Sequence, residues 1–224
     1  MIILLIAFVL AIFVLPNLWA KWVLKRHARG RDDYPGTGAE LAEHLLRRFN
    51  VEGVKVERTE YGDHYDPEAR TVRLSADNHD GRTLTAVTVA AHEVGHALQH
   101  HQGYTPLLAR SRLVLLAQKA EKIGALLMMA APFLFVLTRL PGGLALVIIM
   151  AVISFGTAAV VHLVTLPVEF DASFNRALPI LKDYVPPKDM QGARHVLTAC
   201  AFTYVAASLA SILNLGRWLV ILRR

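Results

Sequence analysis

The chain has 224 residues, 54% of them hydrophobic, and a formal net charge of +6 at pH 7. Its one cysteine, Cys200, excludes an internal disulfide and a cluster of zinc-bound thiolates. The hydrophobic residues exceed the usual share of about 45–50% and gather at the N-terminus and after residue 122, which favours a membrane protein. The basic residues lie beside these apolar runs, so we expect a lipid bilayer as a partner and no nucleic acid.

Residues 1–22 are predicted to form a transmembrane helix. Residues 2–20 carry no charge and are long enough to span a bilayer. Basic residues follow this run instead of preceding it, which is the reverse of a secretory signal peptide; they are Lys21, Lys25, Arg26, Arg29 and Arg31. The positive-inside rule then places the N-terminus outside and the following segment in the cytoplasm.

Residues 32–122 have the composition of a water-exposed segment. Thr37 and Glu40 form a T-x-x-E capping box, which predicts the start of a helix. Apolar residues then follow at helical spacing: Leu41, Leu45 and Phe49.

Two strands are predicted next. Residues 54–60 alternate between apolar and charged, as a half-buried strand does. Residues 71–75 form a second strand after the turn signal Asp66-Pro67-Glu68. We expect an exposed strand just before the following helix, where it could pair with an extended peptide by strand addition.

A helix is predicted over residues 83–99. This run is apolar and free of proline, and Gly103 follows it in the position of a C-terminal cap. Gly95, inside the helix, leaves room for another backbone or a ligand to come close.

The predicted helix contains the sequence His-Glu-Val-Gly-His, residues 92–96. Residues four apart share a helix face, so His92 and His96 can reach one metal ion. Glu93 lies about 100° round the helix from His92, beside the ion and outside its ligand shell. This is the zincin arrangement, with two zinc ligands and a general base for water.

Two further membrane spans are expected at 123–138 and 144–165, within an apolar region 123–166. Residues 167–195 return to the cytoplasmic side, and residues 196–224 supply a C-terminal membrane helix. The predicted fold is therefore mainly α: a multi-pass membrane helix bundle with a small α+β zincin-like metalloprotease domain.

A catalytic zinc site needs a third protein ligand. The metzincin extension requires a histidine at position 102, which here is Gln102. His100 is two turns from His92, about 12 Å along the helix, so His100 and His101 are interpreted as a solvated helix end. Glu121 and Glu169 remain as candidates.

Several motifs resemble one family in the same order. They are Asp63-His-Tyr-Asp-Pro67, Thr71-Val-Arg-Leu-Ser75, Ala91-His-Glu-Val-Gly-His-Ala-Leu-Gln99, Leu166-Pro-Val-Glu-Phe-Asp-Ala-Ser173 and Tyr204-Val-Ala-Ala207. The chain resembles the YugP-type neutral zinc metallopeptidases of bacterial membranes over nearly its whole length. The resemblance implies a multi-pass, gluzincin-like membrane protease with Glu169 as the third zinc ligand.

Residues 169–177 are also similar to a helix of the larger HtpX-type protease class. That class has an aspartate four residues after the ligand glutamate, where this chain has Ser173. A carboxylate that could orient a ligand histidine is therefore missing at 173, and Asp171 or another residue must be considered.

We expect one Zn²⁺ per chain, held by His92, His96 and Glu169, in an enzyme that hydrolyses peptide or membrane-protein substrates. Glu93 would remove a proton from the attacking water and return it to the leaving amine. A further donor should stabilise the oxyanion. The first candidates are His64 and Tyr65, and the alternatives are Arg176, Arg194 and His195.

Two other classes of protein are alternatives to this enzyme. An intramembrane site-2-type protease needs a ligand aspartate in a membrane motif, and Leu140-Pro-Gly-Gly143 carries no carboxylate. A non-enzymatic metal-binding membrane protein has no need of a base such as Glu93. The expected location is the bacterial inner membrane, with the catalytic site facing the cytoplasm.

Overall fold

The computed structural model describes residues 2–31, 33–117 and 164–202, together with residues 119, 122, 126 and 161, and describes side chains from residue 14 onward. Two compact units divide the chain: residues 1–107 with 166–203, and residues 108–165 with 204–224. The predicted spans over 123–166 and 196–224 lie outside the described residues, apart from residues 126, 161, 164–166 and 196–202. The segment boundaries proposed from the sequence stay predictions.

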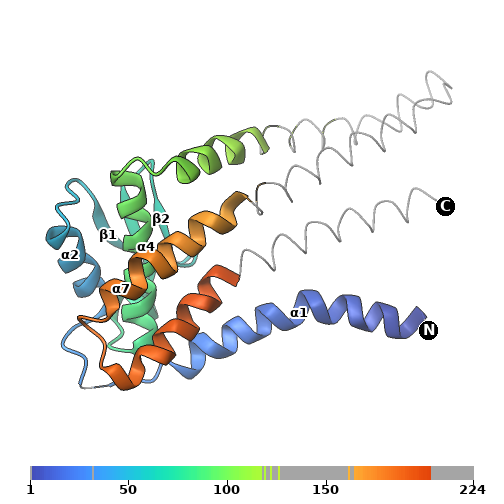
Figure 1. Cartoon of the computed structure of the whole chain (residues 1–224), viewed down its shortest axis with the longest axis horizontal. Helices are drawn as coiled ribbons and strands as arrows, with labels where there is room; N and C mark the ends of the chain where they lie inside the picture. The colour runs from blue at the N-terminus through green and yellow to red at the C-terminus, as the bar shows by residue number, and fades with distance from the viewer. Residues whose placement is uncertain are drawn as a thin grey trace. The chain divides into compact units, whose positions relative to one another are not determined.

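The N-terminal segment is a helix, α1, over Ile2–Arg26 (Figure 1). Its described side chains include the charged Lys21 and Lys25 near its end, whereas Ala20 and Val23 are buried in the protein core. Among the described residues, no helix has both the length and the apolar character needed to cross a bilayer.

The prediction of a multi-pass membrane bundle is therefore wrong. The described fold is mostly helical and includes one small three-stranded sheet. Within the described part of α1, Ala20, which the composition had assigned to lipid, is buried in the protein core, and the charged Lys21 follows it directly.

The sheet consists of β1 (Lys55–Thr59), β2 (His64–Asp66) and β3 (Thr71–Ser75) in the order β1-β3-β2. β3 is parallel to β1 and antiparallel to β2. Both predicted strands are confirmed, but β3 is the central strand. It is therefore not free to pair with a peptide, and the edges of the sheet are β1 and β2.

The predicted turn between β2 and β3 is also present. The Asp66 carboxylate accepts hydrogen bonds of 3.0 Å from the backbone N–H groups of Glu68 and Ala69. Arg70 follows with a φ of 51°, and β3 begins at Thr71. This side-chain-to-backbone bonding turns the chain from β2 directly into the antiparallel β3.

α2 spans Gly38–Arg48 and begins with the predicted capping box. The Glu40 N–H donates to Thr37 Oγ1 at 3.2 Å, and the Thr37 N–H donates to the Glu40 carboxylate at 2.7 Å. Leu45 of the predicted stripe is buried, whereas Phe49 is the exposed C-cap residue.

The short α3 (Ala76–Asp80) leads into α4 (Leu84–His101), the central helix of the first unit. The Thr83 hydroxyl caps α4 by accepting a hydrogen bond of 2.9 Å from the Ala86 N–H. Every residue from Leu84 to Gln99 is buried, because α2, the sheet and a later helix pack around α4. Gly103 follows with a φ of 64°, as a helix C-terminus favours.

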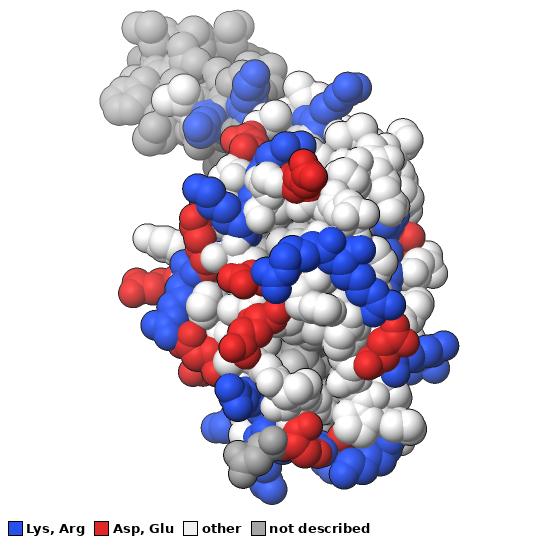
Figure 2. Space-filling view, turned by 90° about the vertical axis from the view of Figure 1, so that its left-hand side faces the viewer, with Lys and Arg blue, Asp and Glu red and all other residues white. Residues whose placement is uncertain are grey.

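The later helix contains a π-helical stretch, η1 (Asp171–Ala177), between helical residues 166–170 and α7 (Leu178–Leu181). Such wide turns are rare and occur often at functional sites. A short 3₁₀ turn, η2 (Pro187–Asp189), and helical residues 190–202 complete this part of the fold. On the face drawn in Figure 2, acidic and basic side chains are intermixed.

Candidate metal centre

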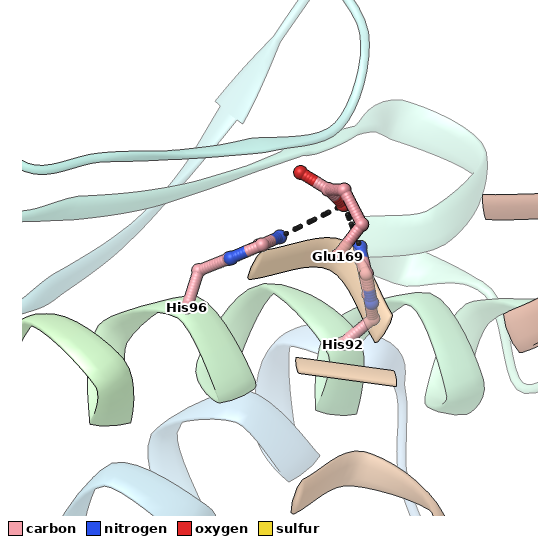
Figure 3. A group of neighbouring side chains, drawn as sticks. All are labelled: His92, His96 and Glu169. Atoms are coloured by element: carbon pink, nitrogen blue, oxygen red, sulfur yellow. Dashed lines mark hydrogen bonds and ion pairs between the residues drawn. The ribbon is translucent and has the colours of Figure 1, made fainter. Parts of the chain in front are cut away.

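Three buried side chains converge between α4 and the helix that precedes η1. His92 and His96 point from one face of α4 toward Glu169 (Figure 3). Each imidazole Nε2 lies 3.3 Å from the same Glu169 carboxylate oxygen, Oε2. The three residues are 3%, 6% and 0% exposed, respectively. The other candidate ligand, Glu121, lies outside the described residues.

The geometry of this group fits a small, borderline-soft cation. Its three ligand atoms lie within 4.8 Å of one another. Tetrahedral zinc with bonds of about 2.0–2.2 Å places its ligand atoms roughly 3.3–3.6 Å apart, which agrees with the two contacts of 3.3 Å. Two imidazoles and one carboxylate form the His₂Glu set that leaves a fourth zinc position for chemistry.

The Glu169 carboxyl is held in its ionised form. Burial opposes ionisation, but the attraction of His96 and hydrogen bonds to His92 and His96 bring the pKa of Glu169 well below its usual range. A carboxylate, and not a carboxylic acid, is the form that binds a metal.

Glu93 is buried beside this group. Burial raises the pKa of Glu93 to about 7, the negative charges of Glu169 and Asp63 act in the same direction, and His92 and a backbone hydrogen bond from Tyr65 oppose them. A carboxyl with a pKa near neutrality is suited to accept and return a proton at physiological pH. The Tyr65 contact also brings the edge strand β2 next to Glu93.

The other nitrogen of each histidine also has a polar partner. His92 Nδ1 lies 3.1 Å from Ser173 Oγ, and His96 Nδ1 lies 3.0 Å from Gln99 Oε1. The Ser173 hydroxyl therefore contacts the histidine directly at the position where the larger class has an aspartate. Asp171 is connected to the site through Gln99, whose Nε2 donates to it at 2.8 Å.

The site residues predicted from the sequence do not include Gln99. It stands three residues after His96, on the same side of α4. That spacing is the signal that could have identified it.

The two candidate oxyanion donors both lie on β2, but their described side-chain bonds go elsewhere. His64 Nδ1 lies 2.8 Å from the backbone carbonyl oxygen of Gly62. The Tyr65 hydroxyl lies 2.8 Å from His100 Nδ1. His100 is thus partly buried, whereas His101 is exposed as predicted.

The alternative oxyanion donors, too, have no described contact with His92, His96 or Glu169. The Arg176 guanidinium donates to Asp171 at 2.6 Å. Arg194 is exposed. His195 lines a cavity of about 450 Å³ together with Trp22 and His27.

Comparisons with known proteins cover nearly the whole chain. A family described as "Putative neutral zinc metallopeptidase" matches residues 1–223. The "Putative membrane protease YugP" of Bacillus subtilis (strain 168) is 38% identical over 213 residues, which are 92% of this chain and 91% of that protein. No solved structure matches the chain. The resemblance predicted from the motifs is confirmed, and the chain belongs to this family of neutral zinc metallopeptidases.

Proposed function

We propose that this protein is a zinc-dependent endopeptidase in which His92, His96 and Glu169 hold the metal and Glu93 is the general base. The observation that carries the proposal is the convergence of two imidazole Nε2 atoms on one buried carboxylate, with a second buried carboxyl of near-neutral pKa beside them. The family, described as a zinc metallopeptidase, supports the same reaction.

Zinc, when bound, supplies a Lewis acid for the peptide carbonyl and for water. The chain supplies the proton transfers. Glu93 accepts a proton from the attacking water and delivers it to the leaving amine, because its carboxyl is buried beside the three proposed ligands. A non-enzymatic metal-binding protein would have no use for a second, ionisable carboxyl in this buried position.

The outer edge of β2, on the side of the strand away from β3, is the proposed path of the substrate. Tyr65 pairs with Val72 of β3 on one side of the strand, and its backbone N–H contacts Glu93. An extended peptide added to this edge would therefore run beside the base and bring one of its carbonyl groups to the site. This assignment replaces the central strand β3, which has neighbours on both sides.

Membrane association is the proposed setting, since the relative is named a membrane protease. Trp19 and Trp22 of α1 are exposed, and the Arg26 guanidinium stacks 5.0 Å from the centroid of the Trp22 ring. Tryptophan with a neighbouring basic residue is typical of a lipid headgroup region. Peptides or membrane proteins remain the proposed substrates, and the cytoplasmic orientation stays a prediction.

The decisive experiment compares metal content and peptide hydrolysis for the same preparation of the Glu93→Gln variant. We expect hydrolysis to fall by about 10²–10⁴-fold, the usual contribution of a general base. Zinc content should stay at the wild-type level, because the three proposed ligands are unchanged. The control is Glu43→Gln, which removes an exposed carboxylate on α2.

Three outcomes contradict the proposal. Zinc loss in Glu93→Gln would make Glu93 a ligand and not a base. Undiminished hydrolysis with zinc retained would mean that another group activates the water. A wild-type protein that binds zinc and cleaves no peptide would favour the non-enzymatic alternative.

A further inference from the structure

The side chain of Gln99 is fully buried and has three polar neighbours. Its Oε1 lies 3.0 Å from His96 Nδ1. Its Nε2 donates to the backbone carbonyl of Val168 at 2.8 Å and to the Asp171 carboxylate at 2.8 Å. The amide thus stands between one proposed zinc ligand and the helix that carries another.

A count of donors and acceptors fixes the orientation of this amide. A carbonyl oxygen and a carboxylate can only accept hydrogen bonds, and a primary amide nitrogen has two hydrogens to donate. Both hydrogens of Gln99 are therefore used by Val168 and Asp171. The reversed amide would place its oxygen against two other acceptors, which is unfavourable in a buried site.

The orientation of the amide in turn fixes the tautomer of His96. Because Gln99 Oε1 can only accept, His96 Nδ1 must carry the hydrogen of this contact. In the neutral imidazole the lone pair then belongs to Nε2, the atom that lies 3.3 Å from Glu169. That is the tautomer a metal requires at this position.

Asp171, which is hydrogen-bonded to Gln99, is itself held in place by further hydrogen bonds. The Asp171 carboxylate also accepts hydrogen bonds from Arg176 Nε at 2.6 Å and from Asn175 Nδ2 at 3.0 Å. Arg176 donates in addition to Gln102 Oε1 at 2.7 Å. The five-residue spacing from Asp171 to Arg176 lies within the π-helical stretch, where residues five apart are neighbours.

We propose that Gln99 is a positioning residue for the peptidase site, and that Asp171 acts through it to hold His96 in the tautomer that binds metal. This inference rests on the proposed function, since it assigns a role to residues behind a proposed zinc ligand. In this proposal, the carboxylate that orients the ligand is that of Asp171, and the Gln99 amide connects it to His96.

The test measures zinc affinity by competition with a chromophoric chelator in three full-length variants. Gln99→Leu keeps the side-chain size and removes the amide. Asp171→Asn keeps Gln99 in place and removes the carboxylate behind it. Both should weaken zinc binding by about 10–100-fold, as loss of a hydrogen-bond partner behind a ligand does. Gln191→Leu, the same change at an exposed helical position, should bind zinc as the wild type does.

A second readout separates positioning from general loss of structure. We expect the visible absorption spectrum of cobalt-substituted protein to change in Gln99→Leu, because a reoriented imidazole alters the ligand field of the bound metal. A purely structural role would lower the amount of folded protein and leave the spectrum of the bound cobalt unchanged.

The possible failures are distinguishable. If the wild-type protein binds neither zinc nor cobalt, the proposed function itself is wrong. If the wild type binds both metals but Asp171→Asn and Gln99→Leu bind zinc within about twofold of it, only the positioning role is overturned. An unchanged cobalt spectrum in both variants would overturn it equally. If Gln99→Leu does not fold, Asp171→Asn decides by both measurements.

Discussion

Gly95 and Ala172 bring two helix backbones into direct contact behind the metal centre. A Cβ atom added at Gly95 would lie 2.8 Å from the Ala172 carbonyl oxygen. The glycine stands between His92 and His96 on α4, and Ala172 lies between Glu169 and Ser173 on the facing helix. The close approach therefore sets the distance between the two halves of the site.

Gly95→Ala should separate these halves. Since the neighbour is backbone and cannot rotate away, the added methyl group must displace the helix of Glu169, at an overpacking cost of about 1–3 kcal/mol. We expect a lower unfolding midpoint and weaker zinc binding, measured by thermal denaturation and chelator competition. Gly30→Ala is the control, because a Cβ there meets no atom within 4 Å. Wild-type zinc affinity in Gly95→Ala would show that the helix spacing does not control the site.

Glu169→Ala should abolish stoichiometric zinc binding, because the two histidines alone leave an incomplete ligand set. Glu121→Ala is the matched comparison, since both glutamates were open candidates from the sequence. Zinc per chain, measured by atomic emission after gel filtration, should stay at the wild-type value in Glu121→Ala. Zinc loss confined to Glu121→Ala would assign the third ligand to the other glutamate.

The stability of the metal-free protein should depend on Glu93 and pH. Folding raises the Glu93 pKa from 4.5 to about 7, so the folded state binds the proton more tightly than the unfolded state does. The free energy of unfolding contributed by this group is therefore lost as pH rises from about 4.5 to about 7.

Metal-free Glu93→Gln should not show that loss. At each pH, the free energy of unfolding of wild type is subtracted from that of Glu93→Gln. This difference should be larger at pH 8 than at pH 5, by up to roughly 3 kcal/mol. Urea denaturation of both proteins in the presence of a chelator, at the two pH values, measures this difference. The same difference at pH 5 and pH 8 would show that Glu93 ionises with its ordinary pKa in the folded protein.

Tyr65→Phe tests the first candidate for oxyanion stabilisation. The described partner of its hydroxyl is His100, so we expect a loss of about 1 kcal/mol in stability and a kcat within about threefold of wild type. Tyr184→Phe, which removes a hydroxyl bonded to His44 and Arg48, is the control. A fall in kcat of about 10²–10³ would instead assign the Tyr65 hydroxyl to the transition state.

Local sequence signals predicted local structure well. The capping box of Thr37 and Glu40 and the spacing of His92 and His96 depend on residues within about one helical turn, and each is present as expected. The three-residue strand β2 was missed because it is too short to show alternation. Its pairing with β3 is a tertiary property that the residues of β2 do not encode by themselves.

Long-range relationships could not be read in the same way. The bond between Gln99 and Asp171 joins residues 72 positions apart, and no periodicity in the sequence predicts it. The prediction of a membrane helix bundle was wrong for a different reason. Apolar composition shows that a residue such as Ala20 avoids water, but the same composition occurs in a protein core, where Ala20 is buried.

The separation between the ligands has a mechanical consequence. His96 and Glu169 are 73 residues apart along the chain. An ion bound to both would act as a crosslink that closes a long loop, and such a closure restricts the unfolded chain more than the folded one. Metal binding in this protein would thus tether α4 to the helix that carries Glu169. A chelator that removes the ion would therefore abolish the reactive centre and also remove a crosslink between two segments that are distant in the sequence.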